Sequence, residues 1–362
     1  MLQELIRFLP VAEKIVPRNS TIEVLRNIAF IDGYIVATDL DIVARMPVPD
    51  TRSFLIPFGI LKTVLKSKPA SLEIDISDEN RIKINYDNKA VSFPRGEVSD
   101  FPNMPIGKFK SIGTWSKDAV MLLHSQLPYA STNELRPALN CIYVNQNGSF
   151  STCATDGHVL RVISDMDPHG ECKLKKFSGI VPKRILQLLP RIVKDSVQVS
   201  YSEDWFRFEM EHDLTLDIRA IDGTYPDFAR VIPQEFASSV QVDVERMKNL
   251  AEAAKAFANR ATMASEFDID EDKVLIKVEN AEENTHWESS MKVERLSGDG
   301  VRVGMNLGYL EKVLDGVSGK KALWKYNDAA SASVFSDPEG NGGSAMNLIM
   351  PIRLAKEGDS DG

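Results

Sequence analysis

Residues 34–48 read YIVATDLDIVARMPV, and residues 149–164 read SFSTCATDGHVLRVIS. Each stretch is an extended run, then Ala-Thr-Asp, then a return to an apolar run. The two aspartates, Asp39 and Asp156, lie 117 positions apart. A repeat of that size is one whole domain, so it predicts a duplicated domain rather than one scaffold around one active site. We therefore expect a function that depends on geometry more than on chemistry.

A second pair of stretches repeats at a similar spacing. Residues 92–105 read SFPRGEVSDFPNMP, and residues 218–233 read IRAIDGTYPDFARVIP. Asp100 and Asp227 within them lie 127 positions apart. The two repeats together favour a domain of roughly 120 residues.

Apolar periodicity predicts six helices, which begin at intervals of roughly 60 residues. The short runs between them alternate apolar and polar residues, which is typical of half-buried antiparallel strands. One helix with several strands, used six times, predicts an α+β fold of three similar domains with two such units in each. The predicted helices cover residues 2–16, 58–68, 116–130, 182–194, 244–260 and 306–317.

Domain boundaries are expected in two polar, loop-like stretches, residues 106–112 and 234–240. A small, acidic segment ends the chain and is typical of a flexible tail. The expected domains are residues 1–108, 109–236 and 237–354, followed by the tail at 355–362.

The composition is that of a soluble globular protein, with 362 residues of which 43% are hydrophobic and 26% charged. No apolar run reaches the roughly 18 residues that would span a bilayer. Residues 1–16 have the pattern of an amphipathic helix rather than of a signal peptide. We therefore expect a cytosolic protein without a membrane partner.

Cysteines and histidines give no sign of a metal or disulfide. Cys141, Cys153 and Cys172 are an odd number without a CxxC pair, which favours buried free thiols. No two of the five histidines stand at metal-ligand spacing with a third ligand nearby, so we expect no metal and no other cofactor. The histidines are His124, His158, His169, His212 and His286.

The net charge of −9 alone argues against binding to a polyanion, but the charge is unevenly distributed. The six helical windows, with the second and last taken as 58–69 and 306–321, carry 17 Lys and Arg against 7 Asp and Glu. Lys and Arg favour helices, which leaves a simple explanation open, but Glu favours them equally and is scarce here. The other interpretation is that the helices share one surface that faces a polyanion, while the outer surface repels it.

Four motifs then stand in order at suitable spacing: ATDGHVLRV at 154–162, YPDFARVIP at 225–233, NLGYLEKVL at 306–314 and MPIRL at 350–354. Together they resemble the bacterial DNA polymerase III beta subunit, the replicative sliding clamp. Each motif alone is a weak signal of this family, but four in order on a chain of the right length make a strong match. The resemblance extends over almost the whole chain, more loosely in the first domain and in residues 262–300.

The resemblance implies a DNA clamp fold, with three similar domains per chain, helices inside and antiparallel sheets outside. Two chains would close head to tail into a ring whose helices line a hole for duplex DNA. It implies no catalysis, because the ring only tethers the polymerase for processive synthesis. The implied partners are double-stranded DNA without sequence preference, a second copy, the polymerase, clamp loader subunits and other proteins with clamp-binding motifs. The implied location is the cytoplasm, in association with the nucleoid.

The resemblance also places residues that would contact DNA. Arg18 follows the first helix at the position of the family's DNA-contacting loop. Lys183 and Arg184 begin the fourth helix and would face the hole. Asn133 matches a polar loop position that the family directs toward DNA.

A second site implied by the resemblance is a pocket for short, mostly apolar partner peptides. It would form where the second and third domains meet. The run LIMPIRL could instead be only a last buried strand, and His158 only a packed loop histidine. The implied pocket residues are Leu139, Thr155, Gly157, His158, Leu160, Pro226, Arg230, Val231, Asn306, Tyr309, Ser333, Leu348, Met350, Pro351, Ile352, Arg353 and Leu354.

Two other functions stay open at this point. Asp156 and His158, two positions apart on a turn, could serve as the acid and base of a hydrolase. Against this, the sequence has no GxSxG elbow, no P-loop and no metal-ligand spacing. A divergent, monomeric clamp-like scaffold or decoy is the second alternative. It is motivated by the missing strand that family members carry before the first helix.

Overall fold

The computed structural model describes residues 1–105, 107–147, 149–166, 175–338 and 344–354. The chain forms two compact units. The first consists mainly of Met1–Met121 and Arg184–Ile221, and the second mainly of residues 122–166, 176–183 and 222–354. The predicted acidic tail, His169 and Cys172 lie outside the described residues.

The six predicted helices are confirmed in the described chain, each within a few residues of its expected start. In α1, the buried residues Leu5, Phe8 and Val11 recur at the helical period and pack one face against the sheet. Asp243 caps α5 by accepting the Arg246 N–H at 2.8 Å. The helices are α1 Leu2–Ile15, α2 Phe58–Lys66, α3 Lys117–Ser125, α4 Lys183–Ile192, α5 Val244–Lys255 and α6 Leu307–Asp315.

Short 3-10 helices connect several of these elements. Two of them, η2 and η6, lie in the repeated DFP and PDF stretches. They are η1 Glu23–Arg26, η2 Val98–Asp100, η3 Leu127–Tyr129, η4 Pro137–Asn140, η5 Glu211–Asp213 and η6 Phe228–Val231.

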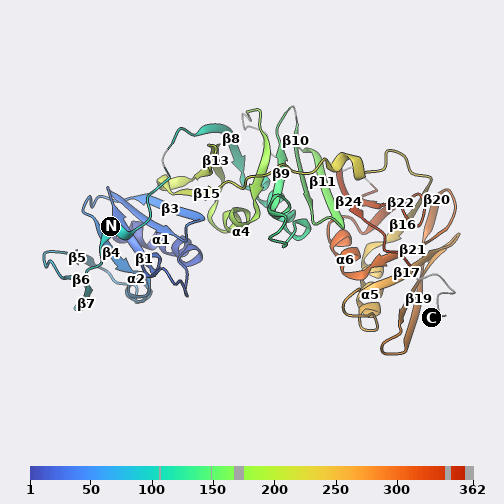
Figure 1. Cartoon of the computed structure of the whole chain (residues 1–362), viewed down its shortest axis with the longest axis horizontal. Helices are drawn as coiled ribbons and strands as arrows, with labels where there is room; N and C mark the ends of the chain where they lie inside the picture. Colours follow the sequence, from blue (N-terminus) through green and yellow to red (C-terminus); the bar gives the residue numbers. More distant parts are fainter. Residues whose placement is uncertain (106, 148, 167–174, 339–343, 355–362) are drawn as a thin grey trace. The chain divides into compact units, whose positions relative to one another are not determined.

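The first unit contains an eight-stranded antiparallel sheet and a separate three-stranded sheet. Figure 1 shows α1 and α2 beside strands β1 to β4; α1 contacts β2 and β3, and α2 contacts β4. The large sheet runs β4 Phe54–Pro57, β1 Asn27–Ile31, β2 Tyr34–Thr38, β3 Ile42–Pro47, β15 Thr215–Arg219, β14 Trp205–Glu209, β13 Ser196–Tyr201 and β8 Lys110–Ser116. The small sheet runs β5 Leu72–Asp75, β6 Arg81–Tyr86 and β7 Lys89–Pro94.

The second unit contains a nine-stranded and a four-stranded antiparallel sheet. Helices α5 and α6 pack side by side and contact strands of both sheets (Figure 1). The larger sheet runs β12 Ser178–Pro182, β9 Cys141–Asn145, β10 Phe150–Thr155, β11 Val159–Met166, β24 Ser344–Ile349, β23 Ser333–Ser336, β22 Lys321–Tyr326, β16 Ser238–Asp243 and β20 Glu294–Ser297. The smaller runs β19 Thr285–Lys292, β18 Lys273–Asn280, β17 Ala264–Ile269 and β21 Val301–Asn306.

Each large sheet joins strands from two of the predicted domains. In the first, β3 pairs with β15, and in the second, β11 pairs with β24. The compact units therefore divide the predicted middle domain, because its two halves each share a sheet with a neighbour. The expected boundaries near residues 108 and 236 fall in loops, and the three-domain division stays a prediction.

Two further expectations concern thiols and membranes. Cys141 and Cys153 are free and buried, as predicted, and burial raises the pKa of the Cys141 thiol to about 12. Both thiols are therefore protonated and unreactive at neutral pH. Among the described helices, none is long and apolar enough to cross a membrane.

Candidate partner-binding pocket and DNA-contacting residues

The Ala-Thr-Asp turn between β10 and β11 is held by its own side chains. The Thr155 hydroxyl donates to the Val159 carbonyl at 2.7 Å and accepts from the Gly157 N–H at 3.0 Å. Asp156 Oδ1 accepts from the N–H groups of His158 and Val159 at 2.9 and 3.0 Å. Gly157 has φ +95°, which favours glycine. Thr and Asp thus fix a tight turn locally.

The turn between β2 and β3 uses the same hydrogen bonds. The Thr38 hydroxyl donates to the Ile42 carbonyl at 2.9 Å and accepts from the Leu40 N–H at 3.0 Å. Asp39 Oδ1 accepts from the N–H groups of Asp41 and Ile42 at 3.1 and 2.9 Å. Leu40 stands where the other turn has glycine, with φ 82°. The repeat in the sequence is therefore a repeat of one hydrogen-bonded turn.

The second carboxylate oxygen of each turn aspartate binds a cation from a helix further along the chain. Asp156 Oδ2 lies 3.3 Å from Lys312 Nζ on α6. Asp39 Oδ2 pairs with Arg184 Nη2 at the start of α4, and Arg184 Nη1 lies 2.9 Å from Asp41 Oδ2. Each turn thus connects the end of a hairpin to a helix far away in the sequence.

An apolar cavity of about 240 Å³ opens beside the second turn. Leu160 and Leu348, which are opposite each other in the β11–β24 pair, form part of its wall. An apolar cavity with a few polar groups suits capture of apolar side chains, and Met adapts to varied ligands. Nine of the predicted pocket residues line it: Leu139, Thr155, Gly157, His158, Leu160, Pro226, Val231, Leu348 and Met350.

Eight predicted pocket residues do not line this apolar cavity, and four of them, Arg230, Asn306, Tyr309 and Ser333, lie before the MPIRL segment. The Arg230 side chain is 84% exposed and pairs with Asp227 at 2.8 Å. Asn306 caps α6 by accepting the Tyr309 N–H at 3.0 Å. Ser333 is buried within β23. Arg230, Asn306 and Ser333 thus pair with, cap or pack within the elements around the cavity and do not form its wall.

The MPIRL segment follows β24 and is held by backbone hydrogen bonds from its first and third residues. The Met350 N–H donates to the His158 carbonyl at 2.8 Å, and the Ile352 N–H donates to the Gly304 carbonyl at 2.9 Å. A Cβ on Gly304 would lie 2.5 Å from the Ile352 carbonyl oxygen, so glycine permits this close approach. The predicted residues of this segment that do not line the apolar cavity are Pro351, Ile352, Arg353 and Leu354.

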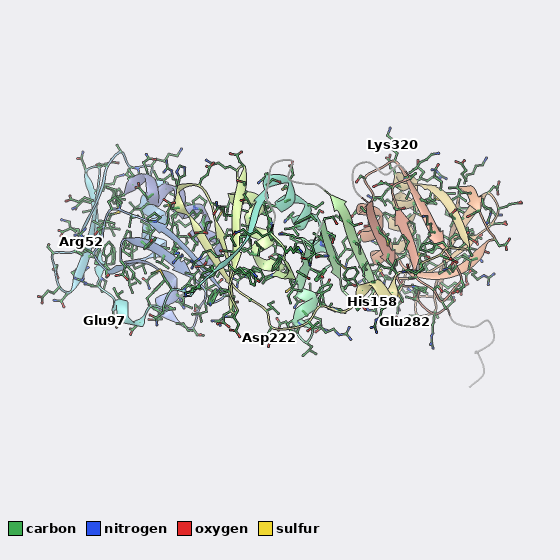
Figure 2. All side chains as sticks on the ribbon, turned by 90° about the horizontal axis from the view of Figure 1, so that it is seen from above. Arg52, Glu97, His158, Asp222, Glu282 and Lys320 are labelled. Carbon is green, nitrogen blue, oxygen red and sulfur yellow. The ribbon has the colours of Figure 1, made fainter. Side chains whose placement is uncertain are left out.

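A polar cavity of about 500 Å³ shares Arg136 and His158 with the apolar one. His158, labelled in Figure 2, belongs to the β10–β11 turn. Its ring stacks on Tyr309 at 5.1 Å between centroids and 13° between planes. Lys312 Nζ lies 5.3 Å from the Tyr309 ring centroid. Burial and the nearby Asp156 raise the pKa of Tyr309, so its phenol stays neutral. The stacked pair lies along the cavity that adjoins the apolar one.

The four predicted DNA-contacting residues have different surroundings. Arg18 is exposed after α1. Asn133 lines the polar cavity. The Lys183 ammonium donates to the Ser131 carbonyl at 2.6 Å, and Arg184 is paired with the first turn as described above. Two of the four are therefore engaged within the chain itself.

The predicted charge surplus of the helices is retained but reduced. The observed helices carry 12 Lys and Arg against 7 Asp and Glu. Several cations are also balanced by carboxylates at close range, which lowers the field they exert on a distant anion. The helical cations paired in this way are Lys62, Arg184, Lys248, Lys255 and Lys312.

Four residues that line the apolar cavity were not predicted from the sequence: Arg136, Val159, Asp227 and Phe228. Three of them lie inside motifs already quoted, so a rule that takes every residue of a motif would have found them. Arg136 follows Asn133 in the same loop and gives no separate signal. Its position depends on how that loop folds back over the turn.

The hydrolase alternative loses its support in this geometry. Asp156 uses one oxygen within its turn and the other on Lys312. The His158 ring is stacked on Tyr309. The two side chains are therefore engaged separately and do not form the acid–base pair that the spacing suggested.

Solved structures define the class of the fold. The crystal structure of the DNA polymerase III subunit beta from Pseudomonas aeruginosa matches with a TM-score of 0.84 and 20% identity, covering 98% of both chains. The Caulobacter crescentus beta sliding clamp also gives a TM-score of 0.84, with 23% identity and 98% coverage of both chains. The predicted DNA clamp fold, with mixed helices and antiparallel sheets, is thereby confirmed.

Sequence comparisons agree with the fold. The beta sliding clamp of Caulobacter vibrioides is 25% identical over 97% of this chain and 98% of its own length. That of Synechocystis is 25% identical over 87% of this chain and 80% of its own. Residues 229–353 match the family model described as the DNA polymerase III beta subunit, C-terminal domain. The resemblance to the bacterial DNA polymerase III beta subunit is confirmed.

Proposed function

We propose that this chain is a DNA sliding clamp. Two copies encircle duplex DNA as a ring and tether the replicative polymerase and other partners for processive synthesis. The role is non-catalytic. The observation that carries the proposal is a repeated junction between predicted domains. The first junction comprises the turn after Thr38, the β3–β15 pair and the Asp39–Arg184 ion pair, and the second comprises the turn after Thr155, the β11–β24 pair and the Asp156–Lys312 ion pair. The chain that carries this repeat is similar to beta sliding clamps along nearly its whole length. Domain contacts that repeat in this way can continue from one copy to the next and close into a ring. They do not build a single active site.

The repeat also supports a site of ring closure. At each junction the third strand after a domain's first helix, β3 or β11, pairs with the last strand of the next domain, β15 or β24. Strand β19 is the third strand after α5, the first helix of the third predicted domain, and β7 is the last strand of the first predicted domain. Neither takes part in such a pair, and each is at the edge of its sheet in the described chain. Pairing of β19 in one copy with β7 in its partner would repeat the junction twice more and close a dimer.

The two edge strands offer one pairing of opposite charges. Strand β19 carries Glu288, with Lys292 at its end, while β7 and its neighbour β6 carry Lys89 and Lys83. Near β19, Phe257 is 38% exposed and stacks on Trp287 at 6.2 Å between centroids. Opposite charges across strands and a partly exposed aromatic pair both favour association of copies.

Retention on DNA would then come from enclosure. Contacts of Arg18, Asn133, Lys183 and Arg184 with phosphates would be weak and independent of sequence. The tethered polymerase meets its template at high effective concentration. Tight binding would hinder sliding, so partial neutralisation of the helical cations is consistent with the task.

Partner proteins would bind the apolar cavity between Leu160 and Leu348 with a short, mostly apolar segment. The proposed partners are the polymerase, the clamp loader and other proteins with such a segment. We place this activity in the cytoplasm, in association with the nucleoid, where the DNA partner is.

Light scattering after size exclusion tests ring closure. The wild-type chain should run near twice 40.3 kDa. Replacing Trp287 with Asp places a charge on the closing strand β19 and should shift the mass to that of one chain. The matched variant Leu296→Asp, at a side chain 51% exposed on β20, should leave the dimer intact. A wild-type chain that stays monomeric would instead favour the scaffold or decoy alternative.

A further inference from the structure

The Arg184 guanidinium is held between two carboxylates in the first unit. Its Nη1 lies 2.9 Å from Asp41 Oδ2, and its Nη2 pairs with Asp39 Oδ2. The Arg184 side chain is 44% exposed and that of Asp41 is 64% exposed, whereas Asp39 is 8% exposed. A cation predicted to contact DNA is therefore within reach of solvent but already paired.

The turn fixes the position of this carboxylate pair. Asp39 Oδ1 accepts from the N–H groups of Asp41 and Ile42, so the orientation of its carboxylate is set before Arg184 arrives. The Asp41 N–H takes part in the turn, but its carboxylate does not, and among the described residues that carboxylate pairs with Arg184. Because Arg184 begins α4, where the helix dipole disfavours a cation, both carboxylates stabilise it there.

We infer that Asp41, together with Asp39, restrains Arg184 from DNA phosphate and so keeps the clamp's direct grip on DNA weak. This inference rests on the proposed function, since it assumes that α4 faces the duplex. Asp41 is a positioning residue that competes with phosphate for one guanidinium. The competition is balanced, because the pair with Asp41 is exposed and therefore weak, and a single phosphate could accept from both guanidinium nitrogens that now bond two separate carboxylates.

The second junction provides an internal contrast. There the turn aspartate Asp156 binds Lys312, and both line the polar cavity next to the apolar one. The residue at the position of Asp41 is His158, whose ring stacks on Tyr309. A second carboxylate on the helical cation is thus a feature of the first junction, the one that carries Arg184.

Binding of the purified dimer to a short linear duplex, followed by fluorescence anisotropy over a range of salt concentrations, tests the inference. Asp41→Asn should bind about three- to fivefold more tightly at low salt, the scale of one exposed ion pair. Its log affinity should fall more steeply with log salt, by about 0.9, since one more phosphate is contacted. The control Asp32→Asn makes the same charge change at a positive-φ turn position that suits Asn, between β1 and β2.

Variants at Arg184 separate release of this side chain from a general change in charge. In the background of Arg184→Gln, Asp41→Asn should no longer tighten binding. Equal effects of Asp41→Asn and Asp32→Asn, or a gain that persists without Arg184, would overturn the inference while leaving the clamp proposal intact. Wild-type protein that is lost from closed circular DNA as fast as from linear DNA would instead contradict the proposed function.

Discussion

The two junctions between predicted domains have the same backbone arrangement. They differ in the side chains on one face of the sheet, the face that carries Thr38 in the first and Thr155 in the second. In the first, Ile42 pairs with Ile218 and Val43 with Asp217. In the second, Val159 pairs with Ile349 and Leu160 with Leu348, in the same register from the turn. The position of the cavity-lining Leu348 is therefore taken by Asp217 at the first junction. One scaffold has been used twice, with different side chains on one face.

At the first junction this face is closed by the chain itself. Asp217 is fully buried and accepts from Arg207 Nε at 2.7 Å, with Arg45 3.9 Å away. Phe101, from the repeated DFP stretch, is 5% exposed and packs in a cluster with Val43. The cluster also contains Ala29, Val36 and Leu55, with Val24, Ile31, Val98, Met104 and Trp205 packed against it.

At the second junction the equivalent stretch stays open. Phe228, which follows Asp227 as Phe101 follows Asp100, is half-buried and lines the apolar cavity. Val231 beside it is 47% exposed. The comparison indicates why one chain would offer one peptide pocket although it repeats the junction: the first copy of the groove is filled by its own linker.

The largest expected effect is the loss of the buried ion pair at the first junction. Asp217→Asn removes a fully buried carboxylate and leaves the partly buried guanidinium groups of Arg207 and Arg45 without it, which should lower the free energy of unfolding by about 3–5 kcal/mol. Urea denaturation that follows unfolding of the first unit measures this loss of stability. The control Asp204→Asn, at an exposed turn residue, should change stability by less than about 0.5 kcal/mol. Equal midpoints for the two variants would show that the first junction does not depend on this pair.

One substitution made at both linker phenylalanines separates packing from binding. Phe101→Ala should lower the free energy of unfolding by about 3 kcal/mol or more, because its side chain fills a closed cluster. Phe228→Ala should cost clearly less stability but weaken binding of a labelled apolar peptide, since this ring lines the open cavity. Denaturation and fluorescence polarisation give the two readouts. The comparison fails if Phe101→Ala is the variant that loses peptide.

A charge at the rim of the open cavity should act on binding alone. Val231→Asp is expected to reduce affinity for the same peptide about tenfold or more, because an apolar side chain of the ligand would face a carboxylate. Val231 is 47% exposed, so the fold should be retained. The same substitution at Leu296, also exposed, serves as the control. Full affinity in Val231→Asp would move the peptide site away from this cavity.

The smallest expected effect concerns the two turns. Leu40 has φ 82° where Gly157 has φ +95°. Leu40→Gly should therefore relieve strain and change stability by no more than about 1 kcal/mol, in the stabilising direction. Gly157→Leu should be destabilising by a similar amount, because a side chain at φ +95° is strained, while Arg136 Nη1 at 3.6 Å from the new Cβ is at ordinary contact distance. Thermal unfolding compares them, and destabilisation by Leu40→Gly would show that the two turns are not equivalent.

The sequence predicted most of the fold and part of the candidate site. Periodicity placed the six helices, and the Ala-Thr-Asp repeat marked the two turns, because both signals are local in the chain. The apolar cavity includes predicted residues of the second turn, such as Thr155 and His158, and Leu348 of β24, whereas Leu139, Pro226 and Val231 reach it from other segments. Most of these residues could be identified from the sequence motifs before the strand pairing was known.

Long-range pairing could not be predicted in the same way. Whether Arg184 meets phosphate or Asp41 depends on a contact across 143 positions. Whether a repeated phenylalanine closes a groove or lines it depends on the strand opposite, where Asp217 or Leu348 decides the chemistry. Such choices follow from tertiary packing, which leaves no periodic trace in the sequence.

Retention on closed circular DNA compared with the same DNA linearised tests the central claim most directly. The protein is loaded onto circles, unbound protein is removed, and the bound fraction is followed after the DNA is cut at one site. A ring that encloses duplex should stay on intact circles and be lost rapidly from cut ones, with little dependence on salt. Equal loss from circles and linear DNA, governed by salt alone, would contradict enclosure.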